Sequence, residues 1–267
     1  MKYDRRLNIL FYLLSLAGAL ALVIPPVLRG DHIAIYAASA FLWILLCAML
    51  FQFLAVRKLN AVMALLESCR TEEYIARYRE LVQNASGSSA YALKLNLSAG
   101  YLEAGRAREA LELLQSLPLV PEGRGKTALE LLYDNNHLVA CRMLDRLEEA
   151  DRALETFRAH LDAAPPRTPQ LEQFRRSFQS QSVLLRMTRG DFEGAEAYWQ
   201  EDLESSARTL RHVAADRYAL GWTLHALGRA EESREHLAWV AENGGDTWYA
   251  ASTREKLAAL PEAKEEA

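Results

Sequence analysis

Two long apolar runs near the N-terminus constrain this chain more than any other feature. Residues 7–28 and 33–56 contain no Asp, Glu, Lys, Arg or His. Each run exceeds the roughly 20 residues that a helix needs to cross the apolar core of a bilayer. A segment in lipid must satisfy its own backbone hydrogen bonds, so both runs are predicted to be helices. Because only residues 29–32 separate them, the sequence predicts a transmembrane helical hairpin over residues 1–58.

Basic residues at the ends of the runs predict the orientation. Three of them lie within positions 2–6, and Arg57 and Lys58 follow the second run, whereas the turn carries Arg29 alone. Cytoplasmic flanks are enriched in Lys and Arg, so both the N-terminus and the C-terminal domain are expected in the cytosol. The first run resembles a signal peptide, but the second run directly behind it favours a retained hairpin. The compact hairpin and the lack of another targeting signal indicate an integral protein of a bacterial inner (plasma) membrane.

The two parts of the chain differ in charge. Residues 1–58 hold six basic and two acidic residues, which leaves 25 of the 31 basic and 33 of the 35 acidic residues, a net charge of −8, for residues 59–267. Proteins that bind nucleic acid need a basic surface, so this acidic part is not expected to do so. Its 209 residues suffice for one large cytosolic domain.

A repeated pattern runs through the cytosolic part. Four times, an amphipathic segment is followed by a turn residue, and a small residue stands five positions later in a second amphipathic segment. A glycine at such a turn can adopt the left-handed conformation that ends a helix, and a small residue lets two helices approach closely. The turn and small residues are Gly105 and Ala110, Asp145 and Ala150, Gly190 and Ala195, and Gly228 and Ser233.

These residues resemble the tetratricopeptide repeat (TPR). Its loose signature has Leu-Gly before an aromatic residue, then Gly, Ala and a large apolar residue. The last unit matches best, with Leu220-Gly221, Gly228, Ser233 and Leu237, and the second unit departs most, with Asp145 at the turn and Cys141 at the aromatic position. The small residues are 40, 45 and 38 positions apart, so the resemblance implies elongated repeats. It also implies an all-α fold in which helix pairs stack into an α-solenoid.

The flanks of the repeats complete the expected domain of residues 59–267. A first helix pair is predicted at 59–84, with Thr71 as the N-cap of its second helix, and the repeats follow at about 88–245. A capping helix is predicted at 246–260, ended by Pro261. Strand-like alternation is absent from the sequence, which again favours an all-α fold.

No motif indicates catalysis, a cofactor or a metal ion. Residues 123–127 (GRGKT) resemble the end of a phosphate-binding loop, but Val120 stands where the motif needs its first glycine. His212 and Asp216 are four residues apart on one predicted helix, but a closed zinc site requires four ligands. We therefore expect no catalytic, cofactor-binding or metal-binding residues, and a protein that is not an enzyme.

The resemblance to TPR proteins implies a partner-binding surface on the first helix of each pair. The corresponding polar and mixed positions are Asn96, Ala99, Asn136, Val139, Gln181, Arg217 and Tyr218. The resulting hypothesis is a membrane-anchored scaffold or adaptor that binds a protein or peptide partner on its solenoid. Two alternatives stay open: a membrane assembly or regulatory protein that acts through the hairpin, with the solenoid as an oligomerising body, and a ligand sensor or cryptic enzyme. Self-association into a homo-oligomer is compatible with each of these.

Overall fold

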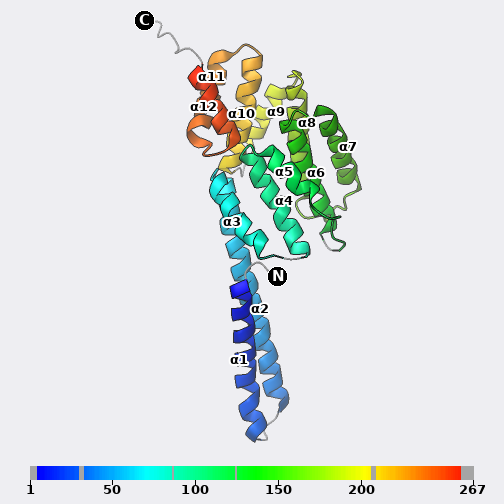
Figure 1. Ribbon diagram of the computed structural model, residues 1–267, viewed down its shortest axis with the longest axis vertical. Helices are drawn as coiled ribbons and strands as arrows, with labels where there is room; N and C mark the ends of the chain where they lie inside the picture. Colours follow the sequence, from blue (N-terminus) through cyan, green and yellow to red (C-terminus); the bar gives the residue numbers. More distant parts are fainter. Residues whose placement is uncertain (1–4, 30–32, 86, 124, 206–208, 260–267) are drawn as a thin grey trace.

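The computed structural model describes residues 5–29, 33–85, 87–123, 125–205 and 209–259 (Figure 1). Within these ranges the chain is all-helical, as the sequence predicts, and forms twelve α-helices. Pro261, the expected end of the last helix, lies outside them. The helices are α1 Arg5–Arg29, α2 Ile33–Glu67, α3 Thr71–Gln83, α4 Ser88–Glu103, α5 Ala107–Gln115, α6 Lys126–Met143, α7 Leu147–Ala163, α8 Leu171–Thr188, α9 Ala195–Glu204, α10 Leu210–Ala226, α11 Ala230–Asn243 and α12 Trp248–Ala259.

The first two helices form an apolar hairpin that projects from the rest of the molecule (Figure 1). Both helices are long and apolar enough to cross a membrane. They pack on each other through Trp43, whose indole Nε1 donates a hydrogen bond to the carbonyl of Leu14 at 3.2 Å. The rings of Phe11 and Phe51 lie 5.1 Å apart further along the same seam. A Cβ added at Gly18 would lie 2.0 Å from Trp43 Nε1, so the indole fits against α1 only because residue 18 has no side chain.

The second hairpin helix does not end at the predicted boundary near residue 58. α2 has 35 residues and α1 has 25, which at 1.5 Å per residue makes α2 about 15 Å longer. Its last turns, 59–67, are the segment that the sequence predicts as the first member of a helix pair with α3. The hairpin and the helical domain therefore share one continuous helix.

Five turns with the same geometry connect the helices. The predicted turn residues Gly105, Asp145, Gly190 and Gly228 all have positive φ, as does Cys69 between α2 and α3, over a range of 57° to 83°. In each turn, the amide after this residue donates to a carbonyl five residues earlier, at 2.8–3.1 Å. This hydrogen bond is typical of the Schellman motif, which satisfies the free carbonyls at a helix C-terminus. The four predicted turns are thus confirmed, and a fifth turn precedes them.

Consecutive helices pack in pairs, but the third unit, α8 and α9, differs from the others. In the other units the second helix begins two residues after the turn residue, whereas α9 begins five residues after Gly190. A second residue with left-handed geometry, Gly194, directly precedes α9 and redirects the chain. As a result, α9 packs mainly against α10 rather than α8. The second unit, which departs most in sequence, keeps the common geometry.

Candidate functional site

Polar side chains join the first helices of neighbouring pairs. The buried amide of Asn136 on α6 donates hydrogen bonds to the carbonyl of Leu95, at 2.9 Å, and to Ser98 Oγ, at 3.0 Å, both on α4. On the other side of α6, Ser177 Oγ of α8 donates to Asn135 Oδ1 at 2.6 Å. These bonds satisfy buried polar groups inside the protein. Asn136, predicted to bind a partner, therefore uses its amide to hold α4 and α6 together.

Arg142 on α6 is the most unusual charged residue of this helix face. Its Nε donates to Gln181 Oε1 of α8 over a long 3.4 Å, and within the part of the chain that the structure describes it forms no ion pair with a carboxylate. Burial lowers the pKa of Arg142 to about 10, and the nearby Tyr218 opposes that change. The guanidinium stays protonated at neutral pH. It is a half-buried positive charge between α6, α8 and α10 that has no carboxylate partner in the described ranges.

The structure places the seven predicted partner-binding residues in different surroundings. Gln181 and Tyr218 lie close to Arg142, but Tyr218 is buried against Trp248 of α12. The Arg217 guanidinium carbon lies 4.7 Å from the centre of the Trp239 ring, on α11.

On α4 and α6, the remaining predicted residues are half-buried. The main-chain carbonyl of Asn96 accepts a hydrogen bond from the Tyr74 hydroxyl at 2.9 Å, and Ala99 lies one turn further on. Val139 packs against the apolar cluster of α2 to α5. Sequence reasoning missed Arg142, although it lies three residues after Val139 and so on nearly the same side of α6. The sequence does show a basic residue three positions after Val139, and this spacing could have added Arg142 to the predicted partner-binding residues.

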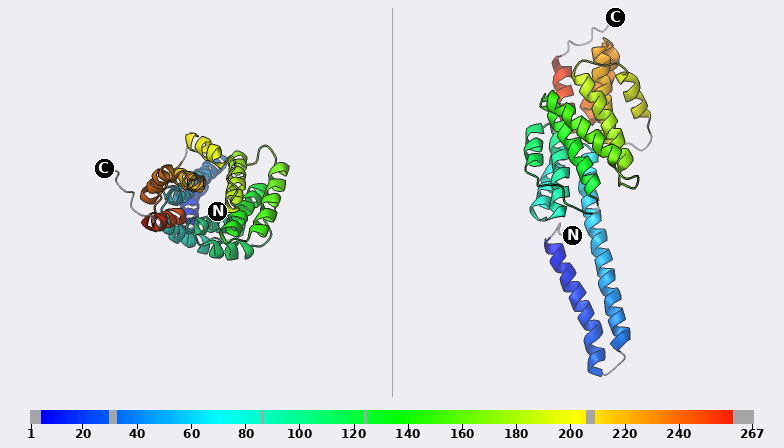
Figure 2. Two further views of the ribbon diagram at one scale, coloured as in Figure 1. Left: turned by 90° about the horizontal axis from the view of Figure 1, so that it is seen from above. Right: turned by 90° about the vertical axis from the view of Figure 1, so that its right-hand side faces the viewer.

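The C-terminal helices α10 to α12 dock at the C-terminal end of α2, and this docking is called the closure. Arg211 at the start of α10 pairs with Glu67 of α2, at 3.3 Å, and with Glu103 of α4, at 2.8 Å. Burial alone would lower the pKa of Arg211, but the two carboxylates outweigh it and raise that pKa. Figure 2 shows α10 to α12 beside α3 and the top of α2.

A backbone contact completes this closure. The Asp246 amide donates to the carbonyl of Cys69 at 3.1 Å. A Cβ added at the neighbouring Gly245 would lie 2.1 Å from that same oxygen, so only glycine allows the approach. Cys69 itself belongs to the apolar cluster of α10 to α12, and burial raises the pKa of its thiol to about 11. It is therefore a packing residue.

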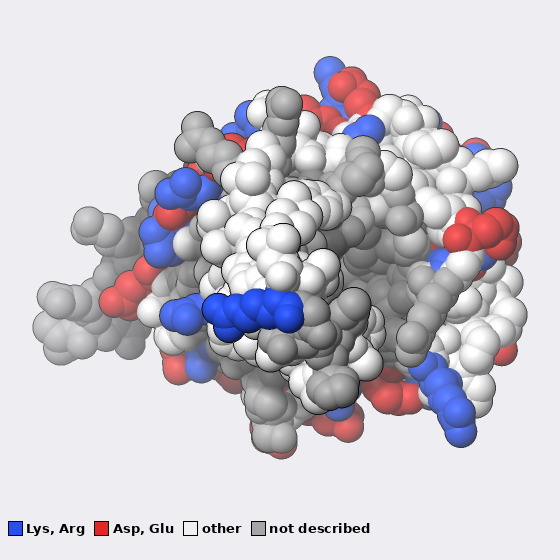
Figure 3. Space-filling model, turned by 90° about the horizontal axis from the view of Figure 1, so that it is seen from below, with Lys and Arg blue, Asp and Glu red and all other residues white. Residues whose placement is uncertain are grey.

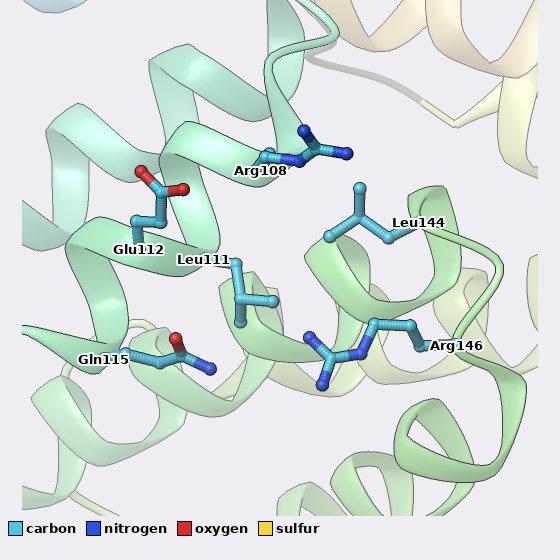
Figure 4. A pocket seen from close by; sticks show the side chains of 6 residues that line it. All are labelled: Arg108, Leu111, Glu112, Gln115, Leu144 and Arg146. Atoms are coloured by element: carbon cyan, nitrogen blue, oxygen red, sulfur yellow. The ribbon is translucent and has the colours of Figure 1, made fainter.

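A surface hollow of about 370 Å³ lies between α5 and the α6–α7 turn (Figure 4). Leu111 and Leu144 form its apolar part, and the polar ends of Arg108, Glu112, Gln115 and Arg146 surround them. Arg146 is already paired with Glu149 at 2.6 Å. The hollow is open to solvent, and its two arginines, Arg108 and Arg146, are exposed.

Within the described ranges, no group of three or more His, Cys, Asp or Glu side chains is placed to hold a metal ion. No family model, no curated protein and no solved structure matches the chain.

Proposed function

We propose that this protein is a membrane-anchored protein-interaction scaffold of the tetratricopeptide-repeat kind. In this proposal the hairpin spans a bacterial inner membrane twice and both termini lie in the cytosol. The helix pairs stack into an α-solenoid, and the face of α6, α8 and α10 around Arg142 binds an acidic segment of a protein partner.

The observation that carries the proposal is the continuity of α2 from the apolar hairpin into the helical domain. α2 enters the domain without a break, and its last turn is held by Arg211 and by the turn before α12. A flexible linker would let the domain swing independently of its anchor. A continuous helix instead gives the domain a fixed position on the hairpin, which suits a scaffold that presents a surface at a membrane.

The exposure of the hairpin supports a membrane location. Only 6% of the most apolar window of α1 and 11% of that of α2 is buried inside the protein, whereas the core helix of a soluble protein would be mostly buried. Seen from the hairpin end, uncharged residues dominate the projecting part, and charges of both signs surround it on the domain (Figure 3). An uncovered apolar surface of this size requires lipid or another partner.

The repeated turns support the likeness to TPR proteins. The predicted small residues Ala110, Ala150, Ala195 and Ser233 are at most 2% exposed, as close packing of paired helices requires. Elongated repeats and the displaced α9 account for the irregular spacing.

The chemistry of the partner follows from Arg142. A carboxylate is the natural counter-charge for a half-buried guanidinium that has no ion pair within the described ranges, because it can accept two parallel hydrogen bonds. Gln181 and the hydroxyl of Tyr218 are close enough to add further polar contacts. An Asp or Glu side chain of an extended or helical segment would supply this group.

Crosslinked affinity capture from intact membranes tests the proposal. Full-length wild type is compared with Arg142→Met and with Arg152→Met, which removes an exposed arginine from the outer helix α7. We expect one protein to be enriched by wild type and by Arg152→Met, and to fall about tenfold or more with Arg142→Met, since each 1.4 kcal/mol of lost binding is tenfold. Equal capture by all three baits would exclude recognition at Arg142. Recovery of the bait alone would favour self-assembly.

A further inference from the structure

Leu119 is an apolar side chain that the fold leaves almost entirely uncovered. It is 94% exposed, more than Leu28 at 81% beside the hairpin turn. It lies in the connection between α5 and α6, far in sequence from the hairpin. The other large apolar side chains exposed in the described part of the helical domain, Leu210 and Leu227, are 38% and 50% exposed.

The connection that carries Leu119 is held by its neighbours. Leu117 and Val120, on either side, pack against the cluster of Tyr91, Leu95 and Leu114. Pro118 and Pro121 bracket the segment and fix φ at two positions. Leu119 therefore points outward from a base that is itself packed.

The fold places this connection at the end of the domain nearest the hairpin. α2 runs from the hairpin into the domain, and after the tight turn at Cys69 α3 runs back toward the hairpin. α4 then runs away from the hairpin and α5 returns toward it (Figure 1). Ala85, after α3, accordingly packs on the same apolar cluster as Leu59, which lies three residues beyond the apolar run of α2. The connection after α5 lies at that same end, because Leu117 and Val120 pack on the cluster that includes Tyr91 in the first turn of α4.

We propose that this connection is a third membrane contact, in which Leu119 enters the boundary between headgroups and acyl chains of the bilayer that holds the hairpin. The inference rests on the proposed membrane anchoring. A single leucine would bind lipid weakly on its own, but the hairpin keeps it beside the membrane at a high effective concentration. The acidic residue nearest in sequence, Glu122, forms an ion pair with Lys126 at 2.7 Å. The contact would fix the tilt of the domain relative to the membrane.

Site-directed nitroxide labels on the full-length protein in phosphatidylcholine nanodiscs test this inference. Single cysteines are introduced by Leu119→Cys, Leu227→Cys and Met49→Cys in a Cys47→Ala background, since the remaining native cysteines are buried. Position 227 is the matched control, an exposed leucine in the turn between α10 and α11. Figure 1 shows this turn at the end of the domain far from the hairpin. Position 49 is exposed on the hairpin itself. The readout is the accessibility of each label to oxygen, which concentrates in lipid, against a water-soluble nickel chelate.

We expect labels 49 and 119 to favour oxygen severalfold over the chelate, relative to label 227. Chelate accessibility at 119 equal to that at 227, with 49 in lipid, overturns the inference and leaves the membrane hairpin standing. Chelate accessibility at 49 overturns the proposed anchoring and this inference with it. Protection of label 119 from both reagents would mean a protein contact and also overturns the inference.

Discussion

Asp246 caps helix α3 at Thr71 although it lies 175 residues later in the sequence. One oxygen of its carboxylate accepts a hydrogen bond from the backbone amide of Thr71. The other oxygen of its carboxylate accepts from the Glu72 amide at 2.9 Å. The prediction that Thr71 caps this helix is wrong, since Thr71 is the first helical residue and its buried hydroxyl has no hydrogen-bond partner. The free amides of the helix start are satisfied by a tertiary contact instead. The folding of α3 is thereby linked to the docking of the C-terminal helices.

Replacing the capping carboxylate should loosen both ends of the domain. Asp246→Ala removes two charge-assisted hydrogen bonds to the amides of α3, and losing an N-cap costs about 0.5–2 kcal/mol. We expect a lower melting temperature and faster amide hydrogen exchange in the first turn of α3 and in α12. Asp162→Ala, which removes an exposed carboxylate at the end of α7, is the matched control and should leave both regions unchanged. Unaltered exchange in α3 would contradict a stabilising role for the cap.

Two glycines with similar backbone geometry should differ in their tolerance of alanine. Gly245 has φ +59°, and a Cβ there would lie 2.1 Å from the Cys69 carbonyl oxygen, whereas Gly190 has φ +83° and open space around it. Gly190→Ala should cost about 1 kcal/mol, the usual penalty of left-handed geometry. Gly245→Ala adds a backbone clash that opens the closure, so we expect about 3 kcal/mol or more. Chemical denaturation of the two variants measures the difference. Equal losses of stability would show that the contact between Gly245 and Cys69 can shift to accommodate a Cβ at little cost.

The sequence predicts the local structure well because local structure has local causes. Helix periodicity and turns centred on Gly or Asp locate the helix pairs from α4 onward and the four turns at residues 105, 145, 190 and 228. The predicted helix pair at 59–84 places the fifth turn, but not its geometry, because Cys69 adopts the left-handed conformation without being Gly, Asn or Asp. Its conformation is stabilised by contacts with Gly245 and Asp246, which no local pattern encodes.

The candidate site is less predictable, since it depends on distances between helices. Asn136 and Arg142 are both polar residues on α6, and the sequence alone cannot tell which one finds partners within the protein. Ser98 on α4 satisfies Asn136, whereas no carboxylate in the described ranges reaches Arg142. The closure by Arg211 likewise joins helices that are far apart in sequence.

The packing of the hairpin should depend on one side of α1. Gly18→Val would push a side chain into the Trp43 indole, while Ala17→Val adds the same kind of bulk at the exposed neighbouring position. Overpacking of a fitted contact costs about 1–3 kcal/mol. We therefore expect Gly18→Val alone to lower the melting temperature in detergent and to expose Trp43 to collisional quenchers. Equal behaviour of the two variants would mean that α1 and α2 separate readily.

Acidification should destabilise the last helix pair through His236. Burial, together with the nearby Arg217 guanidinium, lowers the pKa of His236, against the opposing charges of Glu235 and Glu232. The unfolded chain therefore takes up the proton first as pH falls below about 6.5, so stability is full above that pH and declines below it. His236→Gln cannot be protonated and should flatten this part of the stability profile, measured by melting at a series of pH values. Arg217→Met should reduce the decline without abolishing it. An identical slope in wild type and His236→Gln would assign the acid sensitivity to other groups.

The ion pairs of Arg211 should matter more than ordinary surface ion pairs. Side-chain exposure is 19% for Arg211, 28% for Glu67 and 19% for Glu103, so removing the guanidinium leaves two partly buried carboxylates without a counter-charge. Removing one partner of a buried ion pair costs about 3–5 kcal/mol. Because these side chains are still partly exposed to solvent, we expect a loss of stability near the lower end of that range. Arg211→Met should thus destabilise the protein more than Glu103→Gln, which leaves Arg211 paired with Glu67. Arg211→Lys should recover only part of the loss, because an ammonium cannot reproduce the fork of the guanidinium. Limited proteolysis, together with chemical denaturation, would report detachment of the C-terminal helices from α2. Wild-type resistance of Arg211→Met to the protease would show that these helices stay docked without the ion pairs.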